Sequence, residues 1–379
     1  MTGPGAGRQP TSAPGVPEAG TLGLYLHVPF CQSRCGYCDF YSTTRLDRRQ
    51  DYVRAMVGAI GTAPGAGRRV DTLYLGGGTP SLLGEGVAPI LEAAARHYTL
   101  LPGAEVTLEA NPGTITPPLL EGWRRAGVNR LSLGLQAGED RDLAALGRGH
   151  TLAQGIRAVE QAREAGFDNL SVDIMLATPG QTVDSALALA RLAAGLPVTH
   201  ISAYLLKIEE GTPFARQGVG DRCPPADQAA DIYLAVCRQL EELGFAQYEI
   251  SNFAKPGFHS RHNTRYWTLG DYLGLGPAAH SFFGGRRSCS PPDLEGFLQA
   301  RDPWALVRDD GPGGGWDEEL MLGLRRTRGV DLAHAPNPQR LRTLARPMAQ
   351  AGLLTLEGDR LALTPQGMLV SNSILAALL

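Results

Sequence analysis

Three cysteines lie within eight residues near the start of the chain, in the segment HVPFCQSRCGYCDF. Cys31, Cys35 and Cys38 have the spacing C-x3-C-x2-C, and the other three cysteines are far away in the sequence. Zinc sites usually take four ligands, commonly from two C-x2-C pairs. Three thiolates suit a cubane iron–sulfur cluster, a 4Fe-4S centre with one iron left open for another ligand. A zinc knuckle, or three cysteines of the core, is the alternative.

Further polar and glycine residues follow runs that read as strands. Gly76, Gly77, Gly78 and Thr79 come directly after an apolar run, and glycines let a backbone approach a ligand closely. Taken singly, such a triplet also fits a tight turn, and the polar residues fit an ordinary surface. The remaining candidates at or after the ends of later runs are Glu109, Gln136, Arg148 and Asp173.

Short β-type runs alternate with longer helical patterns from residue 21 onward. The predicted strands are Leu22–Pro29, Val70–Leu75, Glu105–Ala110, Arg130–Gln136, Asn169–Leu176 and His200–Leu206. Helices are predicted near 47–62, 84–97, 116–126, 151–165 and 182–195. This repeated alternation favours an α/β fold with parallel strands. Because the special residues gather at the ends of nearly all the strands, we expect a partial (β/α)6 barrel of the TIM type, not an open doubly wound sheet.

Four regions are expected along the chain. Residues 1–20 read as a disordered tail, 21–245 as the partial barrel, and 246–300 as an aromatic, Gly- and His-rich segment. Residues 301–379 contain two helical patterns, a hairpin in GLLTLEGDRLALTPQG and a final apolar helix, which together predict a small winged-helix-like module.

Composition narrows the class of protein. The net charge of −3 gives no support for nucleic-acid binding, which argues against a DNA-binding role for the C-terminal module. No run of about 18 apolar residues occurs, so no transmembrane segment is expected. The N-terminus lacks the features of a secretory signal, so a cytoplasmic location is expected. There thiols stay reduced, which favours metal ligation over disulfides for the clustered cysteines.

The C-x3-C-x2-C loop after the first strand resembles that of the radical S-adenosylmethionine (SAM) superfamily. In that superfamily the open iron binds the amino and carboxylate groups of SAM, and the glycine motif contacts its methionine part. The resemblance implies SAM contacts for the residues at the strand ends named above. It implies the same for two aromatic residues near the cysteines, Tyr25 and Tyr37.

Longer strings narrow the resemblance to the oxygen-independent coproporphyrinogen III oxidase-like group. They include LYLHVPFC, GGGTPSLL, TLEANPGT, LGRGH, SVDIMLATPGQT and HNTRYW. True coproporphyrinogen dehydrogenases of that group carry a further cysteine two residues after the third, and a long N-terminal segment. Here that position is Phe40, and only a short tail precedes the first strand. Both departures point to the haem chaperone class of the group.

The string HNTRYW resembles a haem-binding signature of that class. It implies haem contacts for His262, Tyr266 and Trp267: an imidazole can ligate haem iron, and the aromatic rings offer flat apolar area. Structural roles are the alternative for all three. His259 and His280 are weaker candidates, and Arg261 and Arg265 are candidate partners of the haem propionates.

The other cysteines are not assigned to the cluster. Cys237 is expected in the core of a helix over 226–243, and Cys223 and Cys289 in polar loops.

The leading hypothesis is a haem chaperone that carries a SAM-ligated 4Fe-4S cluster and delivers haem to acceptor haem proteins, respiratory ones among them. A second copy of the chain is a further candidate partner. The alternative is an enzyme that decarboxylates coproporphyrinogen III.

Overall fold

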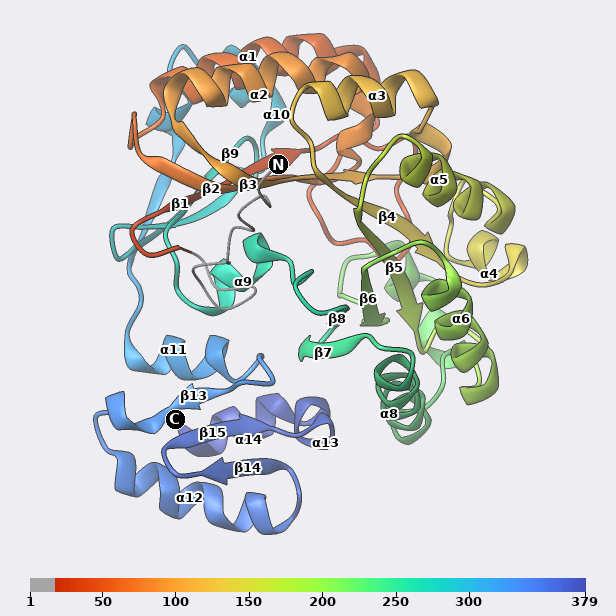
Figure 1. Cartoon of the computed structure of the whole chain (residues 1–379), viewed down its shortest axis with the longest axis vertical. Helices are drawn as coiled ribbons and strands as arrows, with labels where there is room; N and C mark the ends of the chain where they lie inside the picture. The colour runs from red at the N-terminus through yellow and green to blue at the C-terminus, as the bar shows by residue number, and fades with distance from the viewer. Residues whose placement is uncertain (1–17) are drawn as a thin grey trace, which may run out of the picture.

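Twelve strands form one continuous sheet in the computed structural model, which describes residues 18–379 (Figure 1). The tail expected at residues 1–20 lies outside the described residues except for its last three. Of these, Glu18 donates its backbone N–H to the Asp71 carboxylate at 3.1 Å.

Six consecutive strands form the parallel centre of this sheet, in the order of the sequence. They are β1 (Leu22–Val28), β2 (Arg69–Gly77), β3 (Thr99–Ala110), β4 (Arg130–Gln136), β5 (Asn169–Leu176) and β6 (His200–Leu205). The predicted bounds of β4 and β5 are confirmed residue for residue, and the others differ mainly at their ends. A sequential parallel sheet that curves without closing is the expected partial barrel.

Helices cover the outer side of the curved sheet (Figure 1). They are α1 (Arg49–Thr62), α2 (Val87–His97), α3 (Pro117–Arg125), α4 (Asp140–Ala145), α5 (Leu152–Glu164), α6 (Val183–Gly195) and α8 (Ala226–Glu242). The short helix α7 (Pro213–Arg216) instead contacts the cysteine loop, where the Phe214 N–H donates to the Gly36 carbonyl at 2.9 Å. The five predicted crossover helices are confirmed to within a few residues. Their starts are marked by caps: the Thr151 side chain accepts from the backbone of Gln154, whose own side chain bonds back to Thr151.

Short strands extend both edges of the parallel centre. On one side β8 (Asn252–Ala254) pairs antiparallel with β6, and β7 (Ala246–Glu249) with β8. On the other side β9 (Tyr272–Leu275) is parallel to β1. It is followed by the antiparallel strands β10 (His280–Phe283), β11 (Arg286–Cys289) and β12 (Arg308–Pro312). Helix α10 (Leu294–Gln299) lies between β11 and β12 in the chain. Residues 246–312 thus complete the main sheet.

Helix α9 (Arg261–Trp267) connects the two edges and lies on the inner side of the curved sheet (Figure 1). Its Arg265 is fully buried and forms an ion pair with Asp71 on β2. The same guanidinium donates to the Thr21 backbone carbonyl at 3.1 Å. A Cβ at Gly23 would lie 2.5 Å from the Arg265 side chain, so β1 can approach this arginine only with glycine there.

A second hydrophobic core begins at α11 (Trp316–Gly323). It contains α12 (Pro338–Gln350), α13 (Pro365–Leu369), α14 (Ser371–Leu378) and a three-stranded sheet of β13 (Val330–Asp331), β15 (Arg360–Leu363) and β14 (Leu354–Glu357). The predicted hairpin is β14–β15. This helix-and-hairpin arrangement is the expected winged-helix-like module, and it starts at residue 316 because β12 still belongs to the main sheet.

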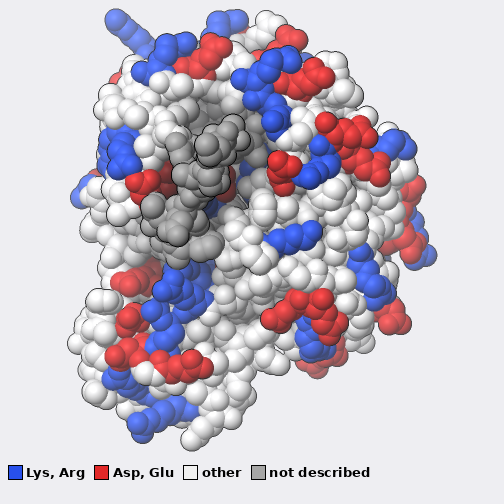
Figure 2. All heavy atoms as spheres, in the orientation of Figure 1, with Lys and Arg blue, Asp and Glu red and all other residues white. Residues whose placement is uncertain are grey.

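Basic and acidic side chains are interspersed over the face shown in Figure 2. None of the helices between residues 18 and 379 combines the length and the apolar character that crossing a membrane requires.

Replacing Arg265 with Ala is expected to lower the free energy of unfolding by about 3–5 kcal/mol, because it leaves the buried Asp71 carboxylate without its partner. Chemical denaturation measures this. The control is Arg45→Ala, which removes an exposed ion pair with Asp47 and should cost less than about 1 kcal/mol. Equal, small losses in both variants would contradict the role assigned to this ion pair.

Candidate functional site

The cysteine loop follows β1, and its backbone is tied to the next part of the chain. The Cys31 N–H donates to the Thr43 carbonyl at 2.9 Å, and the Cys38 N–H to the Cys35 carbonyl at 3.2 Å. All three cysteines are free and partly exposed. Burial raises the pKa of the Cys31 and Cys38 thiols. The loop therefore presents three reduced sulfurs on one side of a cavity.

The number of cysteines at the cavity bears on which metal centre they fit. Among the described residues, Cys31, Cys35 and Cys38 are the three cysteines that line it. Structural zinc sites usually take four protein ligands. Three thiols beside an open position suit a 4Fe-4S cluster.

The glycine motif packs against the start of the cysteine loop. The Gly78 N–H donates to the Val28 carbonyl at 2.8 Å, and the Thr79 N–H to the Phe30 carbonyl at 2.7 Å. A Cβ on Gly78 would lie 2.7 Å from that Phe30 oxygen, and Gly77 has a φ of +111°. Side chains at these positions would push the two loops apart, which explains the glycines physically.

Asn111, which the sequence reasoning did not single out, joins two sides of the cavity. Its amide nitrogen donates to the Thr79 hydroxyl at 3.0 Å, and its oxygen accepts from the Arg148 guanidinium. Thr79 and Arg148 in turn donate to the Cys31 sulfur at 3.7 Å and the Cys35 sulfur at 3.6 Å. The sequence signal that could have identified Asn111 is its place in the string TLEANPGT, directly after the predicted strand Glu105–Ala110. Asn111 therefore holds two sulfur-contacting side chains in place.

Glu109 lies at the end of β3 and is held by two donors. The Tyr74 hydroxyl donates to one carboxylate oxygen at 2.7 Å, and the Gly77 N–H donates to the other at 3.1 Å. Burial is the main reason that the pKa of Glu109 rises from 4.5 to about 7, and the nearby Asp173 adds to it. This carboxyl group changes charge near neutral pH.

Gln136 and Asp173 complete the far wall. Gln136 ends β4 with a φ of +69°, and the pairing of β4 with β5 shifts register just before it. Backbone strain of this kind gathers at binding sites, because it aims a side chain that a regular strand would not. Asp173 accepts from the Ser132 hydroxyl at 3.3 Å, and its burial raises its pKa.

One cavity of about 600 Å³ collects most of the predicted residues. They are Cys31, Cys35, Cys38, Tyr37, Gly77, Gly78, Thr79, Glu109, Gln136, Arg148 and Asp173. Tyr25 and Gly76 are not among its lining residues. The Tyr25 hydroxyl bonds to His27 at 3.1 Å, and its ring stacks on His262. Lining residues absent from the sequence-based set include Phe40, Asn111, Ser132, Gly134, Met175, Tyr204 and Lys207.

His262 lies on the inner side of the sheet, at the other end of the strands. Its imidazole nitrogens are hydrogen-bonded to the Thr72 hydroxyl at 2.9 Å and the Tyr266 hydroxyl at 2.8 Å, and the ring has no exposed surface. Its ring stacks on Tyr74 with centroids 5.2 Å apart. Burial holds its pKa well below the ordinary value. In this arrangement the ring is neutral and joins α9 to β2.

Trp267, the last residue of the same motif, faces the C-terminal module. The Arg325 guanidinium of the C-terminal module lies 4.4 Å from the centroid of its ring. Both side chains line a cavity of about 250 Å³, whose other walls include Ile250, Met321 and Leu375. The indole N–H has no hydrogen-bond partner among the described residues. Of the three haem candidates in HNTRYW, His262 and Tyr266 thus face the barrel interior and Trp267 faces the boundary with the module.

The weaker candidates lie apart from this boundary or are already engaged. Arg265 forms its buried ion pair with Asp71 and does not face this boundary. Arg261 donates to the backbone carbonyl of Asp71 at 2.6 Å. His259 stacks on Tyr248, with centroids 4.2 Å apart. His280 lies on β10, between β9 and β11.

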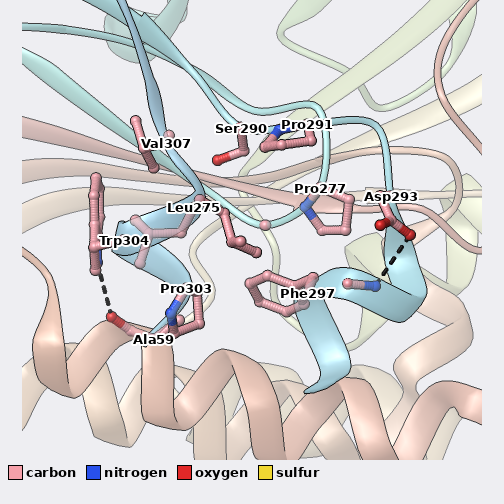
Figure 3. Close-up of a pocket in the computed structure, with 14 residues that line it drawn as sticks. Ala59, Leu275, Pro277, Ser290, Pro291, Asp293, Phe297, Pro303, Trp304 and Val307 are labelled. Atoms are coloured by element: carbon pink, nitrogen blue, oxygen red, sulfur yellow. Dashed lines mark hydrogen bonds between the residues drawn. The ribbon is translucent and has the colours of Figure 1, made fainter. Parts of the chain in front are cut away.

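Another pocket lies between α1, α10 and the segment after β9 (Figure 3). Its apolar walls include Leu275, Phe297 and Trp304, and the Trp304 N–H donates to the Ala59 carbonyl at 3.1 Å. Its volume is about 70 Å³. Pockets that enclose drug-sized ligands measure roughly 300–1,000 Å³, so neither SAM nor haem would fit here.

Comparison with known families matches two parts of the chain. Residues 25–193 match the Radical SAM superfamily, and residues 316–370 match the HemN C-terminal domain. The first region contains the cysteine loop and the other predicted cavity residues, and a radical SAM fold implies a 4Fe-4S cluster and SAM. The second coincides with the C-terminal module.

Similar proteins cover nearly the whole chain. The heme chaperone HemW of Mycobacterium tuberculosis is 38% identical over 98% of this chain and 98% of its own length. The heme chaperone HemW of Bacillus subtilis is 33% identical over 94% of this chain and 98% of its own. Among solved structures, the coproporphyrinogen III oxidase HemN from Escherichia coli superposes with a TM-score of 0.80. It covers 94% of this chain and 90% of its own at 23% identity, which establishes the shared fold.

The raised pKa of Glu109 predicts a pH-dependent stability. Because the folded-state pKa of about 7 exceeds the ordinary value of 4.5, folding favours the protonated form. This stabilisation is fully present below pH 4.5 and is lost as the pH rises to about 7. The free energy of unfolding of Glu109→Gln, measured by urea denaturation relative to wild type, should rise by about 2 kcal/mol from pH 5.5 to 7.5. The exposed Glu160→Gln should track wild type; a pH-independent difference for Glu109→Gln would contradict the assignment.

Proposed function

Because the chain belongs to the HemW haem chaperone family of the radical SAM superfamily, we propose that it binds haem and passes it to acceptor haem proteins. The observation that carries the proposal is the near full-length similarity to proteins named heme chaperones. The motif HNTRYW, placed where two parts of the protein meet, supports it. Respiratory haem proteins are the proposed acceptors, and a second copy of the chain is a proposed partner.

Cys31, Cys35 and Cys38 would hold the 4Fe-4S cluster, whose open iron supplies the position at which SAM binds. The residues around the cavity suit that ligand. Glu109, once deprotonated, and Asp173 offer negative charge to a cationic amino acid, and Arg148 offers a guanidinium to a carboxylate.

We place haem at the boundary between α9 and the C-terminal module. Trp267 offers a flat aromatic surface there, and Arg325 offers a cation beside it. A cavity of about 250 Å³ does not enclose a porphyrin, so part of the ring would stay outside, as delivery to another protein requires. His262 and Tyr266 contribute by holding α9 against the sheet, because the imidazole is fully engaged.

Coproporphyrinogen oxidation has less support. The further cysteine of the dehydrogenases corresponds to Phe40, which is 66% exposed and lines the cluster cavity. The likeness to the solved oxidase extends to the fold only.

The cluster is tested by anaerobic reconstitution followed by iron and sulfide analysis. Wild type should hold about four irons per chain, whereas Cys35→Ala should lose most of the iron and the calorimetric signal of SAM binding. Cys223→Ala, a control that removes a cysteine outside the cavity lining, should keep both. Full iron content in Cys35→Ala would refute the assignment of ligands.

The haem site is tested by titrating the cluster-loaded protein with haem and following the Soret band. One haem per chain is expected, with affinity lowered at least tenfold in Trp267→Ala. Trp304→Ala is the matched control, because it removes an indole from the small pocket of Figure 3, and it should bind like wild type.

Failure of wild type to bind haem stoichiometrically would overturn the proposed function. Equal affinities of the two tryptophan variants would overturn the haem position alone. Loss of binding in His262→Ala with full binding in Trp267→Ala would instead identify the imidazole as the contact and would require α9 to leave the sheet.

A further inference from the structure

Three potential metal ligands meet at the outer edge of the main sheet, far from the cysteine loop in the sequence. His280 on β10, Cys289 on β11 and Asp310 on β12 place one ligand atom each within 4.8 Å of the others. We propose that these residues form a binding site for a divalent cation of borderline softness, Zn²⁺ above all. The site is separate from the proposed cluster, and neither the comparisons nor the family motifs suggest it.

Strand pairing explains how the three side chains come together. His280 and Cys289 are direct partners across the antiparallel pair β10–β11. Between β11 and β12 the register shifts, because Ser288 pairs with Asp309 whereas Arg287 pairs with Gly311. Asp310 is therefore the extra residue of a β-bulge, a feature that redirects a side chain from its regular position. The Cys289 thiol donates to the Asp310 carboxylate at 3.6 Å.

Apart from the contact between Cys289 and Asp310, the donor atoms have few other partners. Among the described residues, the ring of His280 makes no hydrogen bond, and Asp310 takes part in no ion pair. The neighbouring Asp309 instead pairs with Arg286. His280 and Asp310 are exposed and Cys289 is partly exposed, so an ion can reach all three from solvent.

The chemistry of the donors selects the ion. A thiolate, a neutral imidazole and a carboxylate carry a formal charge of −2, which a divalent cation neutralises. Sulfur and nitrogen donors favour zinc, cobalt or nickel over magnesium and calcium, which prefer oxygen. Three protein ligands leave a fourth tetrahedral position for water or an outside ligand. Binding replaces the Cys289 proton, which is released to solvent. Arg308, opposite Cys289, opposes the cation and limits its affinity.

An ion at this place would act on the connection between the two parts of the protein. Strand β12 lies at the edge of the sheet, pairs only with β11 and is mostly exposed. The chain passes from it directly into α11 of the C-terminal module. Cross-linking β10, β11 and β12 through one ion would hold the start of that connection against the main sheet.

The test is a zinc titration of the full-length, cluster-loaded protein under anaerobic conditions, with a coloured chelator as competitor. Keeping the cluster loaded prevents Cys31, Cys35 and Cys38 from taking up zinc, and an unchanged iron content verifies this. Wild type should bind one zinc per chain. Cys289→Ser and Asp310→Asn should each weaken binding at least tenfold, and Arg308→Gln, which removes the opposing charge, should bind at least as tightly as wild type.

Cys223→Ser is the matched control, because it removes another partly exposed cysteine outside the site. As a second measurement, zinc should slow amide hydrogen exchange over residues 308–312 in wild type and leave Cys289→Ser unchanged. Absence of zinc binding to wild type, or equal affinities of Cys289→Ser and Cys223→Ser, would overturn the proposal.

Discussion

The rest of the structure depends on how an open half-barrel closes its polar interior. A full barrel fills its inside with layers of its own side chains, but a six-stranded sheet leaves that surface accessible. Here the segment that carries α9 connects the two edges of the parallel centre, and α9 lies against the inner side of β2 and β3. The buried ion pair of Arg265 with Asp71 and the hydrogen bonds of His262 hold it there. Such a pair specifies one position, because either charge left alone would be costly.

This arrangement links the two ends of the strands by direct contacts. His262 stacks on Tyr74, the Tyr74 hydroxyl holds one oxygen of Glu109, and the other oxygen accepts the Gly77 N–H beside the cysteine loop. His262 therefore contacts Tyr74, the residue that holds the Glu109 carboxylate in the wall of the cluster cavity. Trp267, at the end of the same motif, instead contacts Arg325 of the C-terminal module. A single short helix thus belongs to both proposed sites.

Much of the fold was predictable from the sequence, because alternating apolar runs of strand and helix length are local signals. The cluster residues were predictable because the three cysteines are contiguous in the chain. The position of a side chain along the barrel axis was not predictable. Tyr25 was expected beside the cavity, and alternation does place it facing inward, but its ring lies lower, against His262. Asn111 was missed because its contacts to Thr79 and Arg148 join three separate β/α units.

Strands β11 and β12 were missed for a related reason. They are only four and five residues long, so no local periodicity marks them. Cys289 consequently read as an inert loop cysteine. Its proximity to His280 and Asp310 depends on strand pairing and on one bulge.

Direct haem transfer is the most decisive measurement of the central claim, that this protein delivers haem. The haem-loaded protein is mixed with increasing concentrations of a purified apo-acceptor from the respiratory chain, and the change in absorbance is followed in time. Apomyoglobin, which only captures haem already released, measures spontaneous dissociation. A chaperone predicts a transfer rate that rises with acceptor concentration and exceeds the apomyoglobin rate. A rate that stays equal to spontaneous dissociation at every acceptor concentration would contradict the account.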